Sequence, residues 1–390
     1  FFPEDVDHNL VLEALHYWVR EYHVDGFHLL GGNLPMTAIV QDNMLSRTKI
    51  FYTGFDANIC TIQRKYKNLY VYKEEYMYPA RRVLNHFNAN MREFIDQQRK
   101  QGNKYGFVNF ITSNNGFTLA DLFMYNDRHN EANGEDNLDG NGWNFSNNYG
   151  VEGPTRKRYI NKLRKLKWRN SMAMLFLAQG VPLVWSGDEI GNSQQGNNNA
   201  YCQDNPVGWV NWKNEKTHRR EIHYLEQLAQ FRREHPDVTV DIQMGSVDEV
   251  YRWVLEDRVD MCFASRQDAP LEWTFLRDDE LLAILPPEYD SGETAFPVEA
   301  FNGQEFLMPS MGFDKDILRV LNEHGVTPLI RTTQVSDSAV ISMVEHGLGV
   351  SVLSRLVLRG RQNSVRALPL EPRAVRELGI AARPQKELRP

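Results

Sequence analysis

The sequence is poor in cysteine and has no long uninterrupted hydrophobic run. Its three cysteines are odd in number and lack Cys-x-x-Cys or Cys/His spacing, which argues against a disulfide framework or a zinc site. The most apolar stretch, residues 171–185, is short and is broken by Gln179, Gly180 and Pro182, so no membrane span is expected. The N-terminus carries no basic-then-apolar signal segment. We therefore expect a cytoplasmic protein that holds no metal ion and no cofactor.

Positive charge is also in deficit. The 390 residues include 44 Lys and Arg against 51 Asp and Glu, which gives a formal net charge of −7. This balance provides no general attraction to phosphate backbones or anionic lipids, so affinity for nucleic acid would require a local basic patch. We expect no membrane partner, and no nucleic-acid partner for this chain alone. The apolar fraction of 42% is that of a globular protein, and the length fits two or three domains.

Residue usage changes abruptly along the chain. Of the 32 Asn residues, 29 precede Asp237, and Tyr divides 14 to 2 at the same point. The ratio of Lys to Arg is 12 to 16 before Asp237 and 2 to 14 after it. Such a change predicts a chimera of two pieces with different origins. The alternative is a natural two-domain chain whose domains differ in surface chemistry.

The leading part alternates between expected strands and helices. Apolar residues at helical spacing in 10–19 are followed by a short apolar strand that stops at Gly31 and Gly32. Strands are expected at 24–30, 49–55, 68–72, 106–112 and 181–186, with helices over 79–98 and 156–179. This order indicates a parallel sheet with its chemistry at the carboxyl ends of the strands. Long Asn- and Gly-rich loops at 113–155 and 187–212 would cover that edge.

Four separated strings carry a family resemblance. They are Asn109–Leu119 (NFITSNNGFTL), Tyr125–Glu135 (YNDRHNEANGE), Asn148–Thr155 (NYGVEGPT) and Ser186–Gly191 (SGDEIG). In this order they resemble the glycogen-debranching, isoamylase-type members of the alpha-amylase family, glycoside hydrolase family 13. The resemblance covers residues 1–235 and implies the last five strands of an eight-stranded (β/α)8 barrel.

The family's chemistry is retaining hydrolysis or transfer of α-glucosidic bonds, which needs a carboxylate nucleophile and a protonated acid. By the resemblance, Leu30 stands at the nucleophile position and His28 at that of the orienting Arg. Thr53 stands at the acid position, and Asn114 and Asn115 at the stabilising His-Asp pair. Leu30, Thr53 and the two Asn side chains supply neither a carboxylate nucleophile nor a carboxylic acid, so we expect a catalytically degenerate relative.

Binding of an α-glucan is a separate question. Amides, carboxylates and aromatic rings in the loops could hydrogen-bond to sugars and stack on them. The candidates are His28, Asn114, Asn115, Asp188, Asn199, Gln203, Asp204 and Trp209. The alternative is that Trp143, Trp209 and Trp212 are packed loop anchors and that His28 is a core residue.

The trailing part has a different order of elements. A helix end at 231–236 runs into a short alternating strand at 238–242, a helix from Val247 to about Asp257, and a strand at 259–265. Further strands are expected at 280–285, 305–308 and 350–353, with helices at 315–324 and 336–346. The entry phrase at 231–238 and the Ser-Asp-Ser and Gly-Leu-Gly strings resemble the effector-binding domain of LysR-type transcriptional regulators. The resemblance covers residues 228–380 and implies a periplasmic-binding-protein-like pair of α/β lobes.

By that resemblance a small effector lies between the lobes. The candidate residues are Ser265, Gln267, Ser310, Met311, Ser336, Asp337 and Ser338. The free N–H groups at the start of the last predicted helix would favour an anionic ligand. The alternative, which does not exclude binding, is that Ser336 or Asp337 only caps this helix.

The sequence predicts two joined parts with different folds. The fold class is α/β, with a partial (β/α)8 barrel of about five of eight strands at 1–235 joined to a truncated effector domain at 236–390. We expect no catalytic activity, possible α-glucan binding in the first part and possible binding of a small anionic effector in the second. The alternatives are a glycogen-debranching hydrolase and the ligand-sensing part of a transcriptional regulator.

Overall fold

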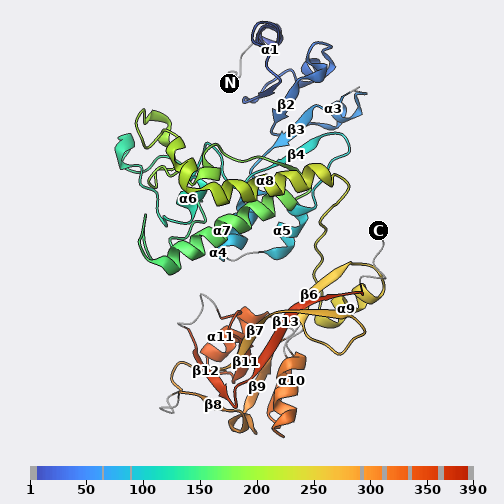
Figure 1. Cartoon of the computed structure of the whole chain (residues 1–390), viewed down its shortest axis with the longest axis vertical. Helices are drawn as coiled ribbons and strands as arrows, with labels where there is room; N and C mark the ends of the chain where they lie inside the picture. Colours follow the sequence, from blue (N-terminus) through green and yellow to red (C-terminus); the bar gives the residue numbers. More distant parts are fainter. Residues whose placement is uncertain are drawn as a thin grey trace. The chain divides into compact units, whose positions relative to one another are not determined.

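The chain folds into two compact units, Phe1–Gln243 (unit 1) and Met244–Pro390 (unit 2) (Figure 1). The computed structural model describes residues 7–63, 66–87, 90–289, 294–309, 314–332, 336–358 and 364–384. Each unit has hydrophobic clusters of its own, so each is described by itself.

Unit 1 is built around a five-stranded parallel sheet. The strands are β1 (Gly26–His28), β2 (Lys49–Tyr52), β3 (Leu69–Tyr72), β4 (Gly106–Asn109) and β5 (Val181–Pro182). They lie in the order β1-β2-β3-β4-β5, each parallel to the next. All five predicted strands are therefore confirmed, although each is shorter than the apolar run that predicts it. The carboxyl ends of parallel strands share one edge, so the loops after them meet there.

Helices connect and cover these strands. They are α1 (His8–Tyr22), α2 (Met36–Gln41), α3 (Ala57–Thr61), α4 (Met77–Asn85), α5 (Met91–Gln98), α6 (Leu119–Leu122), α7 (Arg158–Leu177) and α8 (Arg219–Glu234). One apolar cluster joins α4, α5, α6 and α7 around Phe94, Phe117 and Trp168. Another joins α1 and α2 to the first strands around Leu15, Ile39 and Ile50.

The helical structure predicted near 79–98 is divided between two helices, α4 and α5. His86 ends α4 in the left-handed region at φ 61°. Asn90 begins α5, and its side chain accepts the backbone N–H groups of Arg92 and Glu93. An Asn that satisfies otherwise unpaired donors is a strong start signal, and it marks the break that the apolar spacing hides.

Unit 2 contains one six-stranded sheet and one strand pair. The sheet is formed by β6 (Met261–Ser265), β7 (Glu272–Leu285), β8 (Phe296–Pro297), β11 (Ser351–Ser354), β12 (Arg366–Glu371) and β13 (Val375–Ala382). Its order is β6-β13-β7-β12-β8, and β11 pairs with β7. The parallel pair is β9 (Glu305–Met308) and β10 (Leu329–Thr332). The helices are α9 (Val247–Leu255), α10 (Asp314–Glu323) and α11 (Asp337–Glu345).

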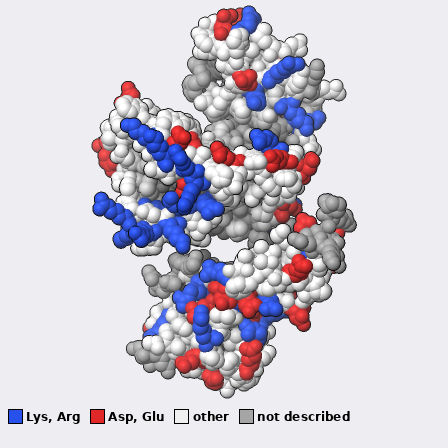
Figure 2. Space-filling model, viewed as in Figure 1, with Lys and Arg blue, Asp and Glu red and all other residues white. Residues whose placement is uncertain are grey.

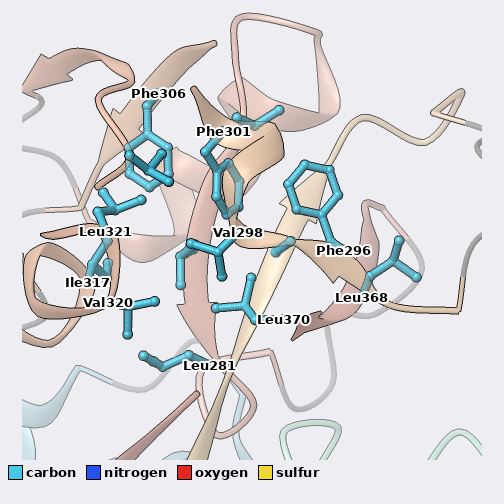
Figure 3. Packing of buried hydrophobic residues seen from close by; sticks show 14 of the residues in the cluster. Leu281, Phe296, Val298, Phe301, Phe306, Ile317, Val320, Leu321, Leu368 and Leu370 are labelled. Carbon is cyan, nitrogen blue, oxygen red and sulfur yellow. The ribbon is translucent and has the colours of Figure 1, made fainter. Parts of the chain in front are cut away.

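The second half of β7 is buried on both faces. Leu281, Ala283 and Leu285 point into the cluster that contains Phe301, Phe306 and the α10 residue Ile317 (Figure 3). The alternate residues Leu282 and Ile284 point into the cluster built by α11. An unbroken apolar run is typical of such two-sided burial. This half of unit 2 therefore has a helix–sheet–helix layering.

The strand predicted at 238–242 is wrong. This segment is extended, but within the described ranges it pairs with no strand, and Val238 is 54% exposed. Asp241 instead forms an ion pair with Arg99 at 2.5 Å, within unit 1. Alternation gives a strand only where a partner supplies hydrogen bonds, and the described part of β6 pairs with β13 alone.

Candidate functional site

The predicted catalytic positions of unit 1 lie along the carboxyl edge of the parallel sheet. Leu30 follows β1 by two residues and is 43% exposed. Thr53 follows β2 directly, and Asn114 and Asn115 stand exposed in the loop after β4. Because these strands are parallel, their ends share one edge. A leucine, a hydroxyl and two amides therefore stand where the family resemblance implies ionisable groups.

His28 ends β1 and contacts an aromatic row at this edge. Its ring lies 4.2 Å from the ring of Tyr72 on β3, which in turn stacks on Phe110 at 4.8 Å. Burial lowers the pKa of His28 below its usual 6.5, so the imidazole is neutral at pH 7. Burial also raises the pKa of Tyr72. Neither ring offers the charge of the arginine that His28 replaces by the resemblance.

Carboxylates near the edge are already engaged. Asp56 caps α3 and accepts the N–H of Ile59 at 2.8 Å. Glu75, in the segment after β3, is ion-paired with Lys100, and the hydrogen bond from this lysine is the main cause of the lowered pKa of Glu75. A retaining glycosidase needs one free carboxylate and one protonated acid. Asp56 and Glu75 supply neither.

Asp188 is fully buried and ties two loops together. Its Oδ2 accepts the hydroxyl of Thr112, and its Oδ1 accepts the N–H of Leu119 at 2.8 Å. Burial raises the pKa of Asp188 to about 7, against the effect of these hydrogen bonds. Because both oxygens are used inside the protein, the carboxyl group contacts the loops after β4 rather than solvent.

Asn199 and Gln203 also form hydrogen bonds between the loops. The Asn199 amide donates to Asp139 at 2.9 Å, and the Gln203 amide donates to the carbonyl of Ala132 at 2.9 Å. Near them, the Asn130 side-chain amide donates to the side-chain oxygen of Asn198, and the backbone N–H of Asn198 donates to the side-chain oxygen of Asn130, both at 2.9 Å. The Asn-rich loops predicted to shape a groove are therefore held to one another by their own amides.

Trp209 is the tryptophan among the predicted sugar-binding residues. It is 55% exposed, and its indole N–H donates to Asp204 at 2.9 Å. Trp143 and Trp212 are 70% and 60% exposed. The alternative prediction that these three rings are packed anchors is wrong, because more than half of each residue faces solvent.

Unit 2 contains a pocket of about 590 Å³ beside the segment that follows β6. Arg266, Gln267 and Asp268 line it from that segment, with Asp316 and Arg319 from α10 and Glu377 from β13. Arg266 forms an ion pair with Glu377 at 3.2 Å. Arg319 donates to the carbonyl of Val375 at 3.0 Å. The pocket thus presents both signs of charge to a polar ligand.

Two of the predicted effector residues belong to this region. Gln267 lines the pocket, and its N–H donates to the Tyr251 hydroxyl at 3.1 Å. Tyr251 in turn donates to the carbonyl of Ser265 at 3.1 Å. Ser265 is 3% exposed, and its hydroxyl oxygen has no hydrogen-bond partner among the described residues. These contacts fix the backbone at the mouth of the pocket.

The other predicted effector residues fall elsewhere. Ser310 and Met311 lie outside the described residues. Ser336 is the N-cap of α11, without a side-chain cap bond, and Asp337 and Ser338 form the first turn. The acidic Asp337 there opposes an anion at this helix start. The described lining of the 590 Å³ pocket includes none of these three residues.

Sequence reasoning missed most of the charged lining of this pocket. Arg266 adjoins two predicted residues and could have been included on that ground. Arg319 and Glu377 carry no such signal, because only the pairing of β13 brings residue 377 next to α10 and β6. In unit 1, reasoning also missed Arg81, a fully buried arginine that donates to the carbonyl of Ile111 at 2.7 Å.

Neither a metal-binding cluster nor a membrane-spanning helix is present among the residues that the structure describes. Among the described residues, no group of three or more His, Cys, Asp or Glu is arranged to hold a metal ion. None of the described helices combines the length and apolar character needed to cross a bilayer.

The chain resembles proteins of two families. Residues 222–390 match the family model for the LysR substrate binding domain, so the C-terminal region is a domain of this class. The N-terminal part is homologous to glycogen debranching enzymes. The chain is 33% identical over 319 residues to the glycogen debranching enzyme of Enterobacter sp. (strain 638), covering 75% of this chain and 48% of that protein.

A second relative matches over a shorter length than the first. The chain is 37% identical over 226 residues to the glycogen operon protein GlgX homolog of Mycobacterium tuberculosis H37Rv, covering 52% of this chain and 31% of that one. It therefore spans at most about half the length of these relatives. Among solved structures, the regulatory domain of Synechocystis CcmR in complex with 2-PG is similar at a TM-score of 0.36 and 20% identity, covering 43% of this chain and 85% of that one. The effector binding domain of QuiR in complex with shikimate gives 0.36 and 17%, covering 42% and 82%.

Proposed function

We propose that the chain is a ligand-binding fusion without glycosidase activity. Its first unit derives from a glycogen-debranching barrel and its second from a LysR-type effector domain. The observation that carries the proposal is the side-chain set at the carboxyl edge of the parallel sheet. Leu30, Thr53, Asn114 and Asn115 supply neither a nucleophile nor a proton there, and the neighbouring Asp56 and Glu75 are engaged in a cap and an ion pair.

The parallel sheet of unit 1 is, in this proposal, five consecutive strands of a (β/α)8 barrel. Sequential order and parallel direction support it. The contact between His28 and Tyr72 supports it further, because it joins side chains of β1 and β3 across the intervening β2. Inward side chains from alternate strands meet in this way inside such barrels.

A chimeric origin is supported by the residue usage. The last Asn and Tyr of the asparagine-rich and tyrosine-rich part are Asn214 and Tyr224, and unit 1 ends at Gln243. Segment 236–246 links the units without helix or paired strand.

The proposed ligand of unit 2 is a small polar molecule with at least one carboxylate. Arg266 and Arg319 would face the carboxylate, while Asp268 and Gln267 would accept or donate hydrogen bonds to hydroxyl groups. A pocket of about 590 Å³ accommodates a ligand of the size of shikimate or 2-PG, which the related domains hold. Binding of an α-glucan by the loops of unit 1 would depend on Trp209 and Trp143 as surfaces on which sugar rings stack.

Activity is tested with the purified full chain on glycogen, amylopectin and pullulan. Release of reducing sugar should not exceed that of a heat-treated sample. Turnover that a glycosidase inhibitor abolishes would refute the loss of catalysis. Glucan binding is tested separately by retardation in glycogen-containing native gels. Trp209→Ala should lose any retardation, whereas Trp18→Ala, an exposed tryptophan of α1, should keep it.

Effector binding is tested by titration calorimetry of the full chain with shikimate and with 2-PG. Arg266→Gln should weaken binding at least tenfold, because it removes a cation from the pocket. Arg252→Gln, on the exposed face of α9, is the matched control and should bind like the parent chain. Equal affinity in both variants would locate the ligand outside this pocket.

A further inference from the structure

Helix α7 carries an unusual charge for a protein with net charge −7. Its 20 residues include six basic side chains and no acidic one. Two of the six are buried and used internally. Arg164 donates to the carbonyls of Gly153 and Asn148 at 2.8 and 2.9 Å, and Lys167 donates to the carbonyl of Leu84. The remaining four basic side chains are exposed on the surface of the helix.

These four basic residues form one exposed stripe. Arg158, Lys162, Lys165 and Arg169 follow one another at steps of four, three and four residues, which places them on a single helix face. The stripe is about 16 Å long at about 1.5 Å per residue. Lys165 pairs with Glu221 at 2.9 Å. Within the described ranges, no carboxylate lies in ion-pair distance of the other three. Like charges at this spacing repel, so a bound anion would stabilise the helix.

The stripe forms one wall of a groove. The groove has a volume of about 690 Å³ and runs between α7 and α8, where Arg220 adds a fifth cation. Tyr224 of α8 lies beneath the guanidinium of Arg169, with 4.7 Å between that group and the ring centroid. In the space-filling view, Lys and Arg side chains gather over the part of unit 1 that α7 and the start of α8 occupy (Figure 2).

An apolar hollow continues this groove. It has a volume of about 250 Å³ and shares Asn161, Lys165 and Glu221 with the groove. Phe123 and Trp168 are among the side chains that line it. The surface therefore joins a row of cations to a recess that accepts a flat apolar group.

We infer that this α7–α8 groove binds single-stranded nucleic acid without sequence selectivity, with phosphates along the stripe and a base in the hollow. Cations along a groove with aromatic side chains nearby are the usual means of such binding. Three of the five cations are arginines, whose planar donors match phosphate oxygens in pairs. An acidic peptide would form ion pairs with the stripe of basic residues, but it has no base to fill the apolar hollow. The inference concerns neither the sheet edge nor the unit 2 pocket, and it is independent of the proposed function.

The experiment measures the fluorescence anisotropy of a labelled 20-nucleotide oligothymidine with the full chain from 50 to 200 mM salt. Four or five phosphate contacts give a slope of about −3 in log K against log salt for a single strand. The double variant Arg158→Gln/Lys162→Gln should reduce the slope by about 1.4 and weaken binding at each salt concentration. The variant Arg20→Gln/Arg92→Gln removes the same charge from exposed positions of α1 and α5 and should leave both quantities unchanged.

Several results would overturn the inference. The inference is wrong if the parent chain shows no salt-dependent binding, or if the two double variants weaken binding of the oligothymidine equally. Equal competition by inorganic polyphosphate or polyglutamate at matched charge would also reject nucleic acid as the occupant, because neither has a base. Glutamine has nearly the helix propensity of lysine and arginine, so α7 should remain folded, and an unchanged thermal transition verifies this.

Discussion

Arg232 donates from Nη1 to the carbonyl oxygen of Ala178 at 2.6 Å, just beyond the last residue of α7. The same nitrogen donates to Phe176 at 2.8 Å, and Nη2 donates to Gly180 at 2.5 Å. Carbonyls at a helix end lack partners within the helix and carry its negative dipole charge. One guanidinium thus bonds carbonyls in the last turn of α7 and in the residues that follow it. The segment Phe231–Pro236 therefore acts structurally in unit 1.

Replacing Arg232 should destabilise unit 1. Arg232→Met removes charge-assisted hydrogen bonds and leaves partly buried carbonyls unpaired, at a cost of about 2 kcal/mol. Arg233→Met is the matched control, because the neighbouring side chain is exposed and points elsewhere. Calorimetry should show a lower midpoint for the unit 1 transition in the first variant alone. Equal midpoints in the two variants would mean that the hydrogen bonds of Arg232 do not stabilise unit 1.

The buried Asp188 should make unit 1 sensitive to pH. Its folded pKa of about 7 lies above the unfolded value near 3.9, so folding favours the protonated form. Stability from this group is complete below about pH 4 and is lost as the pH rises toward 7, by at most about 4 kcal/mol. Asp188→Asn should therefore gain stability over the parent chain as the pH rises through this window.

The control for this pH effect is Asp136→Asn, at an exposed position. Its free energy of unfolding should follow that of the parent chain from pH 4.5 to 7.5. A constant difference between the parent chain and Asp188→Asn over the same range would show that Asp188 does not titrate differently in the folded state.

Adjacent residues of α10 test the core of unit 2. Ile317 is 1% exposed and lies in the cluster shown in Figure 3, whereas Leu318 is 36% exposed. Ile317→Ala should cost about 2–5 kcal/mol because it leaves a cavity, and Leu318→Ala should cost far less. Urea titration followed by Trp253 and Trp273, the two tryptophans of unit 2, reports the difference once the other tryptophans are replaced.

The segment between the units should be the first site of proteolysis. Residues 236–246 have neither helix nor paired strand in the described structure, and Val238 and Met244 are 54% and 61% exposed. Limited digestion with thermolysin, which cuts before apolar residues, should release two fragments of about 28 and about 17 kDa, which divide the 45.3 kDa of the chain in proportion to their lengths. Primary cleavage inside β7 or α7 would contradict the two-unit description.

The sequence predicted best where burial is local and two-sided. The run Leu281–Leu285 marks a strand by itself, because both of its faces contact helices. The first half of β7, from Glu272 to Asp279, was missed. Six of its eight residues are exposed and four are charged, and it is a strand because distant β13 pairs with it. Long-range pairing leaves no periodic signal in the segment that receives it.

Polar residues show the same limit. Asp188 was grouped with sugar-binding candidates because a carboxylate in a loop after a strand has the right chemistry. Its partners Thr112 and Leu119 are some seventy residues away in sequence, so its burial could not be read from its neighbours. The proposal that Leu30 occupies a nucleophile position, by contrast, rests on the resemblance and on residue type alone, since a leucine has no acidic group.

The position of β13 in its sheet has a consequence for synthesis. This strand, Val375–Ala382, lies between β6 and β7 and is the described partner of β6. A ribosome adding about 5–20 residues per second needs roughly 6–20 s to travel from Ser265 to Val375. During that interval the nascent β6 exposes backbone donors and acceptors on both sides, together with Met261 and Phe263. Cellular yield should therefore depend on chaperone supply and elongation rate more than on the equilibrium stability of the finished chain.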